Sequence, residues 1–473
     1  MKKVLPISVS IMLLQFIISG CFAQNAEVIL TKISLKNQPL LERHEPFNRA
    51  IETPQLRTTP DGYVLSYIDV NFNSHLLLLD TDFQVFKDIR LSQSGIVNVC
   101  TDNEEIAILK VKYTKQPKIS DDAHSEHQLY FERYSYEGEK LSRVRLIGDP
   151  EFKNKRNSRS YITRFESKLI AFNGTYYAAF SFAFNNLKKY DKCHHRLVQI
   201  TRENKVQVIS TRKKRVLQTQ LLVREDTLYH VYMQTRGPRA VLLQKYALTE
   251  LSIAPIEKVE IKNPSSDIDE VLTVRSDEIN LFAITDGADE QEFMCRDNLM
   301  PVRIEKVFFQ QDQMKMVLSS MQGNKSYDIE LVNYDQQGNL SEKVSIAKSS
   351  RYHESSCFVN VLDSSLFMVY RYLDSRDKSP VRSKAVLYNT QSGESQEQMI
   401  DISYVAKPVF QFYEDALAGN ERLMKCDFRV NTRRHYHVNY NHLQTDQGMI
   451  LLYWDENGFD LSQVLIPDNA LLE

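Results

Sequence analysis

The histidine-rich segment RRHYHVNYNH, residues 433–442, is the first place where residue types and spacing could do chemistry. Alternate residues share one side of a strand, so His435 and His437 would lie on the same face with His442 nearby. Imidazole nitrogens at this spacing can hold zinc or another divalent metal. One strand supplies no closed ligand set, however, and a polar, aromatic-lined loop explains the same residues. His435 and His437 are therefore candidate metal ligands, and we expect no cofactor.

A second cluster, KKYDKCHHR, occupies residues 188–196 and begins with Lys188 and Lys189. Its Cys-His-His run also suggests a metal site. Adjacent residues of a strand point in opposite directions, so this run cannot converge on one ion. We therefore expect a solvated loop here.

Local charge is more informative than either cluster. Ten Lys/Arg residues between positions 186 and 215 face only Asp191 and Glu203, whereas residues 267–292 hold nine Asp/Glu and a single Arg275. Charge runs of this kind either solvate a surface or dock an anionic glycan or a charged protein. In the second case the binding residues would be Lys188, Lys189, Arg212, Lys213, Lys214 and Arg215, and binding should weaken as salt rises.

These residues sit within a unit of roughly 50 residues that recurs about eight times after residue 58, a period typical of propellers and solenoids. Each unit opens with a polar turn followed by a short apolar strand. The openings lie at Asp61, Asn103, Asn173, Glu225, Asp277, Asp312 and Asp363, with a divergent last copy near Asn420. A second strand pair follows most openings, for example MILLYWDENGFDLSQVLI from Met449.

The repeat predicts an all-β chain that forms a single β-propeller of seven or eight four-stranded blades, because a blade is such a unit and radial packing hides sheet edges. The apolar opening strands, such as residues 64–68, are expected to be buried between blades. Residues 26–57 would supply a strand that closes the ring and a lead-in, 58–467 the propeller and 468–473 a tail.

These repeats resemble the β-propeller superfold, and in particular the secreted propeller proteins of bacterial cell envelopes. The resemblance covers residues 58–467. It is specific to the fold alone, because the copies lack the Trp-Asp ending of WD40 blades, the Gly-Gly pattern of kelch blades and the Asp boxes of sialidases. Function must therefore be argued from a site.

The N-terminus predicts export. Two lysines precede a mainly apolar run, Val4 to Ile18, that is too short and interrupted to span a bilayer comfortably, so residues 1–23 are typical of a signal peptide. Two cleavages compete: one after Ala23, and one before Cys21, where Ile18-Ser19-Gly20-Cys21 resembles the lipobox of lipoproteins. We expect a periplasmic, outer-membrane-anchored or extracellular protein with no transmembrane helix and a possible lipid on Cys21.

Composition and motifs narrow the function. Lys plus Arg (59) nearly balances Asp plus Glu (61), and export argues against a nucleic-acid partner. The sequence contains no motif of a known catalytic class, and the recurring turn aspartates, including Asp102 and Asp312, fit turn chemistry. We expect a noncatalytic propeller that binds or scaffolds a protein partner or an anionic glycan. The alternative is a carbohydrate-active hydrolase or lyase with its site at the mouth of the propeller channel.

Overall fold

The computed structural model describes nineteen stretches of the chain, and all statements below concern them. They are residues 28–34, 54–69, 71, 73–113, 127–147, 167–183, 193–212, 216–234, 241–248, 253–261, 302–310, 312–322, 326–335, 340–347, 357–372, 382–400, 440–446, 448–455 and 458–466. They contain strands and turns and no helix, so no helix among them could cross a membrane.

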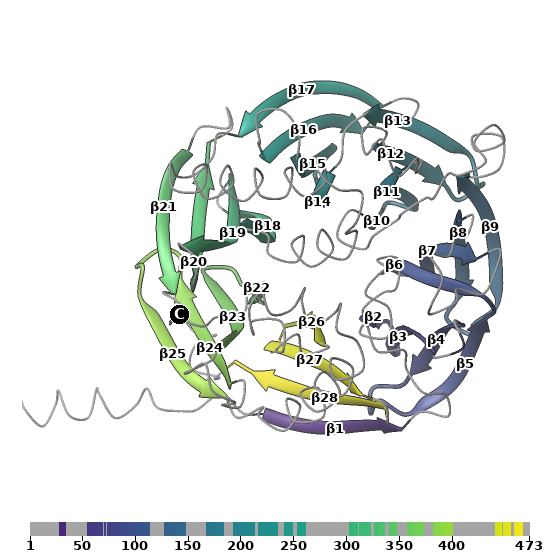
Figure 1. The fold of residues 1–473 in the computed structure, drawn as a ribbon, viewed down its shortest axis with the longest axis horizontal. Coiled ribbons are helices and arrows are strands. Elements are labelled where there is room, and N and C mark those ends of the chain that lie inside the picture. Colours follow the sequence, from purple (N-terminus) through teal and green to yellow (C-terminus); the bar gives the residue numbers. More distant parts are fainter. Residues whose placement is uncertain are drawn as a thin grey trace, which may run out of the picture.

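Twenty-eight strands form seven four-stranded antiparallel sheets arranged in a ring (Figure 1). Blade 1 holds β2 (Gln55–Thr59), β3 (Gly62–Ile68), β4 (Ser74–Leu79) and β5 (Val85–Leu91). Blade 2 holds β6 (Ser94–Thr101), β7 (Glu105–Tyr113), β8 (His127–Ser135) and β9 (Lys140–Ile147). Blade 3 holds β10 (Lys168–Phe172), β11 (Thr175–Ala183), β12 (Cys193–Thr201) and β13 (Val206–Arg212). Blade 4 holds β14 (Val216–Arg224), β15 (Thr227–Gln234), β16 (Val241–Leu248) and β17 (Ile253–Ile261).

The remaining blades follow the same order from the axis outward. Blade 5 holds β18 (Val302–Gln310), β19 (Gln313–Gln322), β20 (Ser326–Tyr334) and β21 (Leu340–Ala347). Blade 6 holds β22 (Cys357–Val361), β23 (Ser365–Tyr372), β24 (Arg382–Asn389) and β25 (Ser395–Ile400). Blade 7 holds β26 (Tyr440–Thr445), β27 (Gly448–Asp455) and β28 (Gly458–Leu465), with β1 (Val28–Ser34) as its outermost strand.

The N-terminal strand closes the ring. Strand β1 pairs antiparallel with β28, from Val28 opposite Val464 to Ser34 opposite Gly458. Each innermost strand contacts the innermost strands of both neighbouring blades, and β26 of blade 7 contacts β2 of blade 1. The two ends of the chain thus share one sheet, which leaves no open gap between the first and last blades.

Apolar second strands fill the spaces between blades. Strands β3, β7 and β11 carry the long apolar runs of the repeats, and residues such as Leu65, Leu109 and Phe180 have no exposed surface. The sequence predicted that these buried runs open each blade. In the structure another strand precedes each of them and lies closest to the axis.

The blade number is seven, within the predicted range of seven or eight. The turns predicted at Asp61, Asn173 and Asp363 each join the first and second strands of a blade. The opening predicted near Asn420 lies outside the described residues, and the turn between the first and second strands of blade 7 is at Asp446. The opening predicted at Asp277 lies outside the described residues.

Antiparallel pairing gives the two ends of the ring different connections. The first-to-second turns of all blades and the third-to-fourth turns of blades 1 to 6 fall at one end, and the second-to-third and blade-to-blade connections fall at the other. We call the first end the tight-turn face. Its described turn residues include two cations, Arg202 and Lys205, against fifteen carboxylates. These are Asp61, Asp80, Asp82, Asp102, Glu104, Glu137, Glu139, Glu203, Glu225, Asp226, Asp312, Asp335, Asp363, Glu394 and Asp446.

Candidate functional site

Carboxamide side chains join the innermost strands of neighbouring blades. Gln55 of blade 1 bonds the backbone of blade 2, donating to the Val97 carbonyl at 3.0 Å. Gln218 of blade 4 accepts the backbone N–H of Ile304 in blade 5 at 2.7 Å. Asn360 of blade 6 donates to two backbone carbonyls of blade 7, at 2.9 and 2.8 Å. Neutral amides therefore satisfy polar backbone groups that the ring would otherwise leave unpaired near its axis.

Two cations on innermost strands form no ion pair with any carboxylate that the structure describes. Arg57 of β2 donates to two backbone carbonyl oxygens, at 3.1 and 2.8 Å, and to Oε1 of Gln55 at 3.3 Å. Lys306 of β18 donates from Nζ to Oε1 of Gln444 in β26 at 3.1 Å. Both cations are half-buried, and all of these acceptors are neutral. We call Arg57 and Lys306 the axial cation pair.

The backbone of β18 directs Lys306 toward the axis. A β-bulge shifts the register between Ile304 and Lys306, and bulges of this kind re-aim side chains. Lys306 belongs to blade 5 and reaches Gln444 of blade 7, passing the innermost strand of blade 6. Burial, with a smaller contribution from the positive charge of Arg57, lowers the pKa of Lys306 to about 8. Lys306 reaches β26, whose neighbour in the ring is β2, the strand of Arg57, so an anion bound near both cations would offset their like charge.

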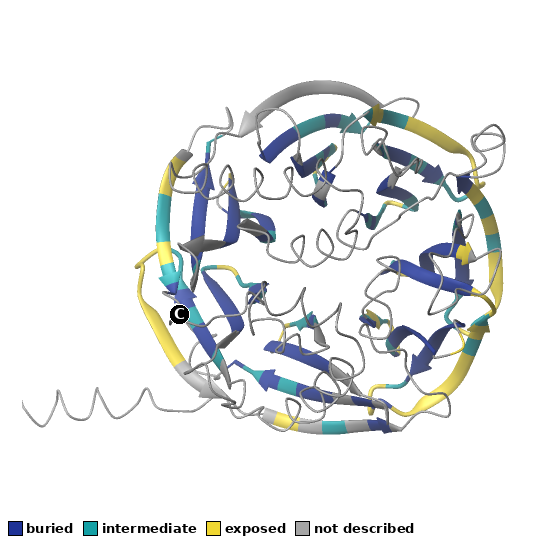
Figure 2. Ribbon diagram, in the orientation of Figure 1, coloured by how far each residue is buried: buried dark blue, intermediate teal, exposed yellow. Residues whose placement is uncertain are grey.

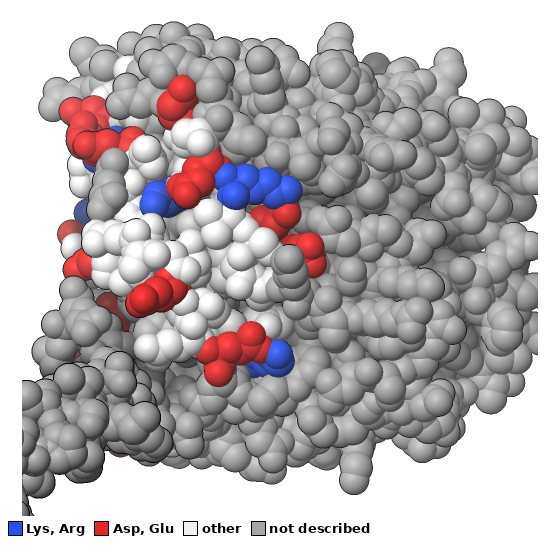
Figure 3. All heavy atoms as spheres, turned by 90° about the vertical axis from the view of Figure 1, so that its left-hand side faces the viewer, with Lys and Arg blue, Asp and Glu red and all other residues white. Residues whose placement is uncertain are grey.

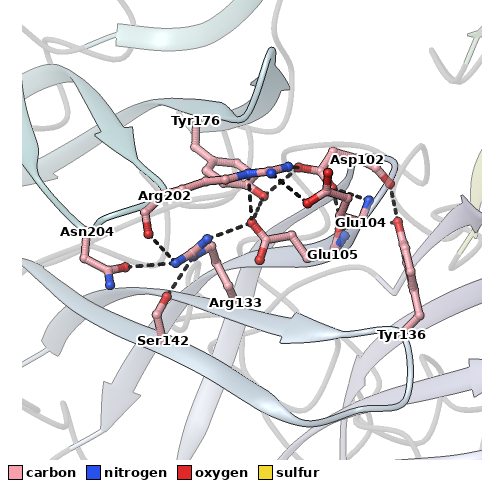
Figure 4. A network of polar contacts seen from close by, with 9 residues as sticks. All are labelled: Asp102, Glu104, Glu105, Arg133, Tyr136, Ser142, Tyr176, Arg202 and Asn204. Atoms are coloured by element: carbon pink, nitrogen blue, oxygen red, sulfur yellow. Dashed lines mark hydrogen bonds and ion pairs between the residues drawn. The ribbon is translucent and has the colours of Figure 1, made fainter.

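A second polar cluster joins blades 2 and 3 at the tight-turn face (Figure 4). Its nine residues are Asp102, Glu104, Glu105, Arg133, Tyr136, Ser142, Tyr176, Arg202 and Asn204. Arg133 forms an ion pair with Glu105 at 2.8 Å and donates to the backbone carbonyl of Arg202 at 2.6 Å. The hydroxyl of Tyr176 lies 2.8 Å from Asp102 and 2.5 Å from Glu105. We call these nine residues the charged seam.

Asp102 also caps its own turn, as the sequence predicted for the turn aspartates. Its Oδ1 accepts the backbone N–H groups of Glu104 and Glu105, both at 2.8 Å. Burial would raise the pKa of Asp102, but these hydrogen bonds, that of Tyr176 and the charge of Arg202 outweigh it and hold the pKa below its ordinary value. This carboxyl stays ionised at neutral pH.

The charged seam contains the residue types that the enzyme alternative requires. A tyrosine next to a carboxylate base can serve as a nucleophile in glycoside cleavage. Tyr176, however, has no exposed surface, and burial together with Glu105 and Asp102 raises its pKa, opposite to what a nucleophile needs. Asp102 is held ionised and is therefore unsuited to act as a general acid. We interpret the charged seam as a structural link between blades.

A third cluster, of neutral groups, joins blades 3 and 4. His195 of β12 and His230 of β15 approach to 3.2 Å between their Nε2 atoms, and both are almost completely buried. Ser181 bonds Nδ1 of His195 and Thr219 bonds Nε2 of His230, each at 2.9 Å. Burial lowers the pKa of His195 to about 3 and that of His230 well below its usual range, in both cases with a contribution from Arg212. We call these imidazoles the histidine seam.

The structure corrects the interpretation of residues 188–196 in part. Residues from Cys193 onward form strand β12, and His195 is buried against blade 4, so a solvated loop was wrong for this half of the cluster. A strand rich in basic residues can still be internal when neighbouring blades supply hydroxyl and imidazole partners. Within the described stretches, no group of three or more His, Cys, Asp or Glu side chains is placed to hold a metal ion.

Most predicted site residues lie outside the described residues. These are Cys21, Lys188, Lys189, Lys213, Lys214, Arg215, His435 and His437. Arg212, the last residue of β13, is described and half-buried. Its guanidinium lies over the ring of Tyr232, 4.7 Å from the centroid, and donates to Gln244 of blade 4. Arg212 therefore packs within the histidine seam and is not one of the exposed cations that the charge run predicted.

Sequence reasoning missed the axial cation pair. Arg57 lies in QLRTT and Lys306 in VRIEKVFFQ, two segments that the repeat analysis did not assign to a blade opening. The signal available in the sequence was that each cation lies a few residues before the opening turn of a repeat, Arg57 before Asp61 and Lys306 before Asp312. It could not have shown that blades 1 and 5 bring these two residues together.

Comparisons with known proteins support no function. No protein-family profile and no curated protein matches the chain. Among solved structures, the WD40 domain of SCAP from fission yeast aligns over 94% of this chain and 99% of its own, with 7% identity and a TM-score of 0.40. A GH43 β-1,3-galactosidase aligns over 69% and 97%, with 12% identity and a TM-score of 0.36. A subtype N10 neuraminidase-like protein of A/little yellow-shouldered bat/Guatemala aligns over 80% of this chain and 100% of its own, with 9% identity and a TM-score of 0.37. With TM-scores this low, these likenesses carry no argument about activity.

Proposed function

We propose that this protein is a noncatalytic, exported propeller of the cell envelope that binds an anionic glycan. The observation that carries the proposal is the axial cation pair, which meets no carboxylate among the described residues. Cations removed from water without a counter-charge are costly, so a site that holds two of them favours an anionic ligand.

Sulfate or uronate groups suit the chemistry of this pair. The guanidinium of Arg57 has N–H groups in a planar fork that matches a carboxylate or sulfate, and Lys306 adds a compact point charge. With a pKa of about 8, Lys306 is still mostly protonated at neutral pH. The neutral amides of Gln55 and Gln444 hold both cations in place without cancelling their charge.

Replacement of Lys306 tests the proposal. Lys306→Met keeps most of the side-chain volume but removes the charge, and we expect it to weaken binding of sulfated or uronate oligosaccharides by roughly ten- to a hundredfold, the usual value of a charge-assisted hydrogen bond. Lys205→Met makes the same charge change on the tight-turn face and serves as the matched control. Titration calorimetry at two salt concentrations measures both.

Three results would reject this function. The first is a wild type that binds none of the sulfated or uronate oligosaccharides, and the second is equal binding by Lys306→Met and Lys205→Met. The third is release of cleaved products by the wild type, as the hydrolase or lyase alternative requires. If envelope proteins are captured instead, and the triple variant Lys213→Ser, Lys214→Ser, Arg215→Ser slows their association, the ligand is a charged protein that binds at residues 213–215. Arg212 is left unchanged in that variant because it packs in the histidine seam.

A further inference from the structure

The outermost strands carry much of the exposed backbone of the ring (Figure 2). Six large apolar side chains are exposed on the described surface, and all lie on the outermost strands of consecutive blades. They are Ile29 of β1, Val85 and Phe86 of β5, Leu141 of β9, and Val206 and Val208 of β13. Phe86 is 61% exposed and Leu141 50%. These strands belong to blades 7, 1, 2 and 3, which follow one another around the ring. We call the six residues the rim arc.

The rim arc also lies at one height. Ile29, Phe86 and Leu141 are each the second residue of an outermost strand, and Val206 is the first residue of β13. All four outermost strands begin at the same end of the ring. The apolar side chains therefore form a row along the rim, whereas single exposed apolar residues on soluble proteins are usually scattered.

Basic side chains accompany the row. Strands β5 and β9 expose five cations, Lys87, Arg90, Lys140, Arg143 and Arg145. The one carboxylate on these strands, Asp88, bonds the buried imidazole of His75 at 2.9 Å. Lys140 and Arg143 share Glu132 with a third cation, Lys110, so cations outnumber carboxylates on these two strands. The turn carboxylates Asp80, Asp82, Glu137 and Glu139 lie beyond the first residues of the strands, at the tight-turn face. Apolar side chains flanked by Lys and Arg are typical of surfaces that lie on anionic lipid.

The outermost strands of blades 5 and 6, on the opposite side of the ring, differ from the rim arc in both their apolar and their basic side chains. The exposed residues described on β21 and β25 are Ser341, Glu342, Ser345, Ser395, Gln396 and Glu397. On this side of the molecule, the described acidic and basic side chains are interspersed among uncharged residues (Figure 3). Among the outermost strands whose side chains the structure describes, the exposed apolar residues are therefore confined to blades 7, 1, 2 and 3, and the exposed basic residues accompany them on β5 and β9.

We propose that the part of the rim arc on blades 1 and 2 lies against the surface of an anionic phospholipid bilayer, with Phe86 and Leu141 inserted among the lipids and the cations of β5 and β9 at the phosphates. The N-terminus supports this occupant, because Cys21, the residue that the lipobox would acylate, precedes Val28 of β1 by seven positions. Seven residues span at most about 24 Å. A lipid on Cys21 would therefore hold blade 7, and with it blade 1, next to the membrane. This tether rests on the export assumed in the proposed function.

The charge of the tight-turn face sets the orientation. Its fifteen described turn carboxylates would be repelled by an anionic bilayer, so the disc does not lie on that face. Attachment by the rim places the ring edge-on, with its axis roughly parallel to the bilayer. Both ends of the axis then face solvent, and the axial cation pair remains reachable by a glycan while the protein is bound to the membrane.

Vesicle binding by the unlipidated chain that begins at Gln24 tests the proposal. We expect sedimentation with vesicles of phosphatidylcholine and phosphatidylglycerol to be at least roughly tenfold stronger than with phosphatidylcholine alone, and to weaken with salt. The double variant Phe86→Ser, Leu141→Ser and the double variant Lys87→Gln, Arg90→Gln should each lose most of this binding. The matched control, Ser345→Asn with Gln396→Ser, alters the opposite rim and should bind as the wild type does.

Three outcomes would overturn the proposal, provided that thermal melting shows all proteins to be folded. The first is equal vesicle binding by the wild type and both rim variants, and the second is no vesicle binding by the wild type. The third is a dimer in sedimentation velocity that the Phe86→Ser, Leu141→Ser variant converts to monomer, which would make the arc an interface between two copies of the chain. Glycan titrations keep the two proposals separate, because the rim variants should retain oligosaccharide binding and Lys306→Met should retain vesicle binding.

Discussion

Blades 2 and 3 are joined by buried charges, whereas blades 3 and 4 are joined by buried neutral imidazoles. In the charged seam, carboxylates meet guanidinium groups and a tyrosine hydroxyl (Figure 4). In the histidine seam, low pKa values keep His195 and His230 uncharged. Both arrangements satisfy polar groups between blades, but they fail under different conditions. Removal of one partner by mutation should lower the free energy of unfolding more in the charged seam than in the histidine seam. A fall in pH should lower it through the histidine seam before it affects the charged seam.

The largest effect should come from Arg133. Arg133→Met leaves Glu105, only 5% exposed, without its close ion-pair partner, and breaking a buried pair in this way typically costs about 3–5 kcal/mol. Arg202→Met is the matched control within the same network. Because Arg202 is 37% exposed, its loss should cost about 1 kcal/mol or less. Urea unfolding of both variants measures the difference, and equal losses would show that burial does not distinguish the two arginines.

Acid should act on the histidine seam with a smaller effect. The folded-state pKa of His195, about 3, lies below its unfolded value of 6.5, so its contribution is fully present above pH 6.5 and is lost as pH falls toward 3. At pH 5 a histidine with these two pKa values lowers the free energy of unfolding by about 2 kcal/mol relative to its value at neutral pH. His195→Gln should reduce the loss of stability between pH 7 and pH 5 by that amount. An unchanged pH dependence in this variant would mean that His195 accepts a proton while folded.

His75 of blade 1 provides an internal contrast in sign. Burial would lower its pKa, but hydrogen bonds to Asp69 and Asp88 outweigh this and raise it. Its contribution is therefore present at acidic pH and fades as pH rises through the folded-state pKa. Acid stability of the whole chain combines both kinds of histidine, so the variant must be compared with wild type at each pH.

Local features of the fold could be predicted from sequence, and contacts between blades could not. Turn residues such as Asp61 and Asn173 mark hairpins because their conformational preferences act within a few residues. Residues 26–57 were expected to supply the strand that closes the ring, and β1, which lies within them, pairs with β28. Strand β2 was missed because its five residues, QLRTT, show no apolar run.

The candidate site depends on ring closure and therefore escaped the sequence analysis. The interaction between Arg57 and Lys306 requires the register of two strands about 250 positions apart and a bulge in β18. Tyr176 meets Asp102 only because blades 2 and 3 pack face to face. The rim arc escaped for a related reason, since VFKDIRL in β5 carries no alternation that would show Phe86 to be exposed.

The pKa of Lys306 is the most direct test of the proposed anion site. NMR titration of ¹³C-methylated lysines, with Lys306→Arg to assign the resonance, would follow this group without and with a sulfated tetrasaccharide. We predict a pKa of about 8 in the unliganded protein and an increase on binding, because a nearby anion favours the protonated form. A pKa at the ordinary lysine value of 10.5 in the unliganded protein, or one unchanged by the saccharide, would contradict the account.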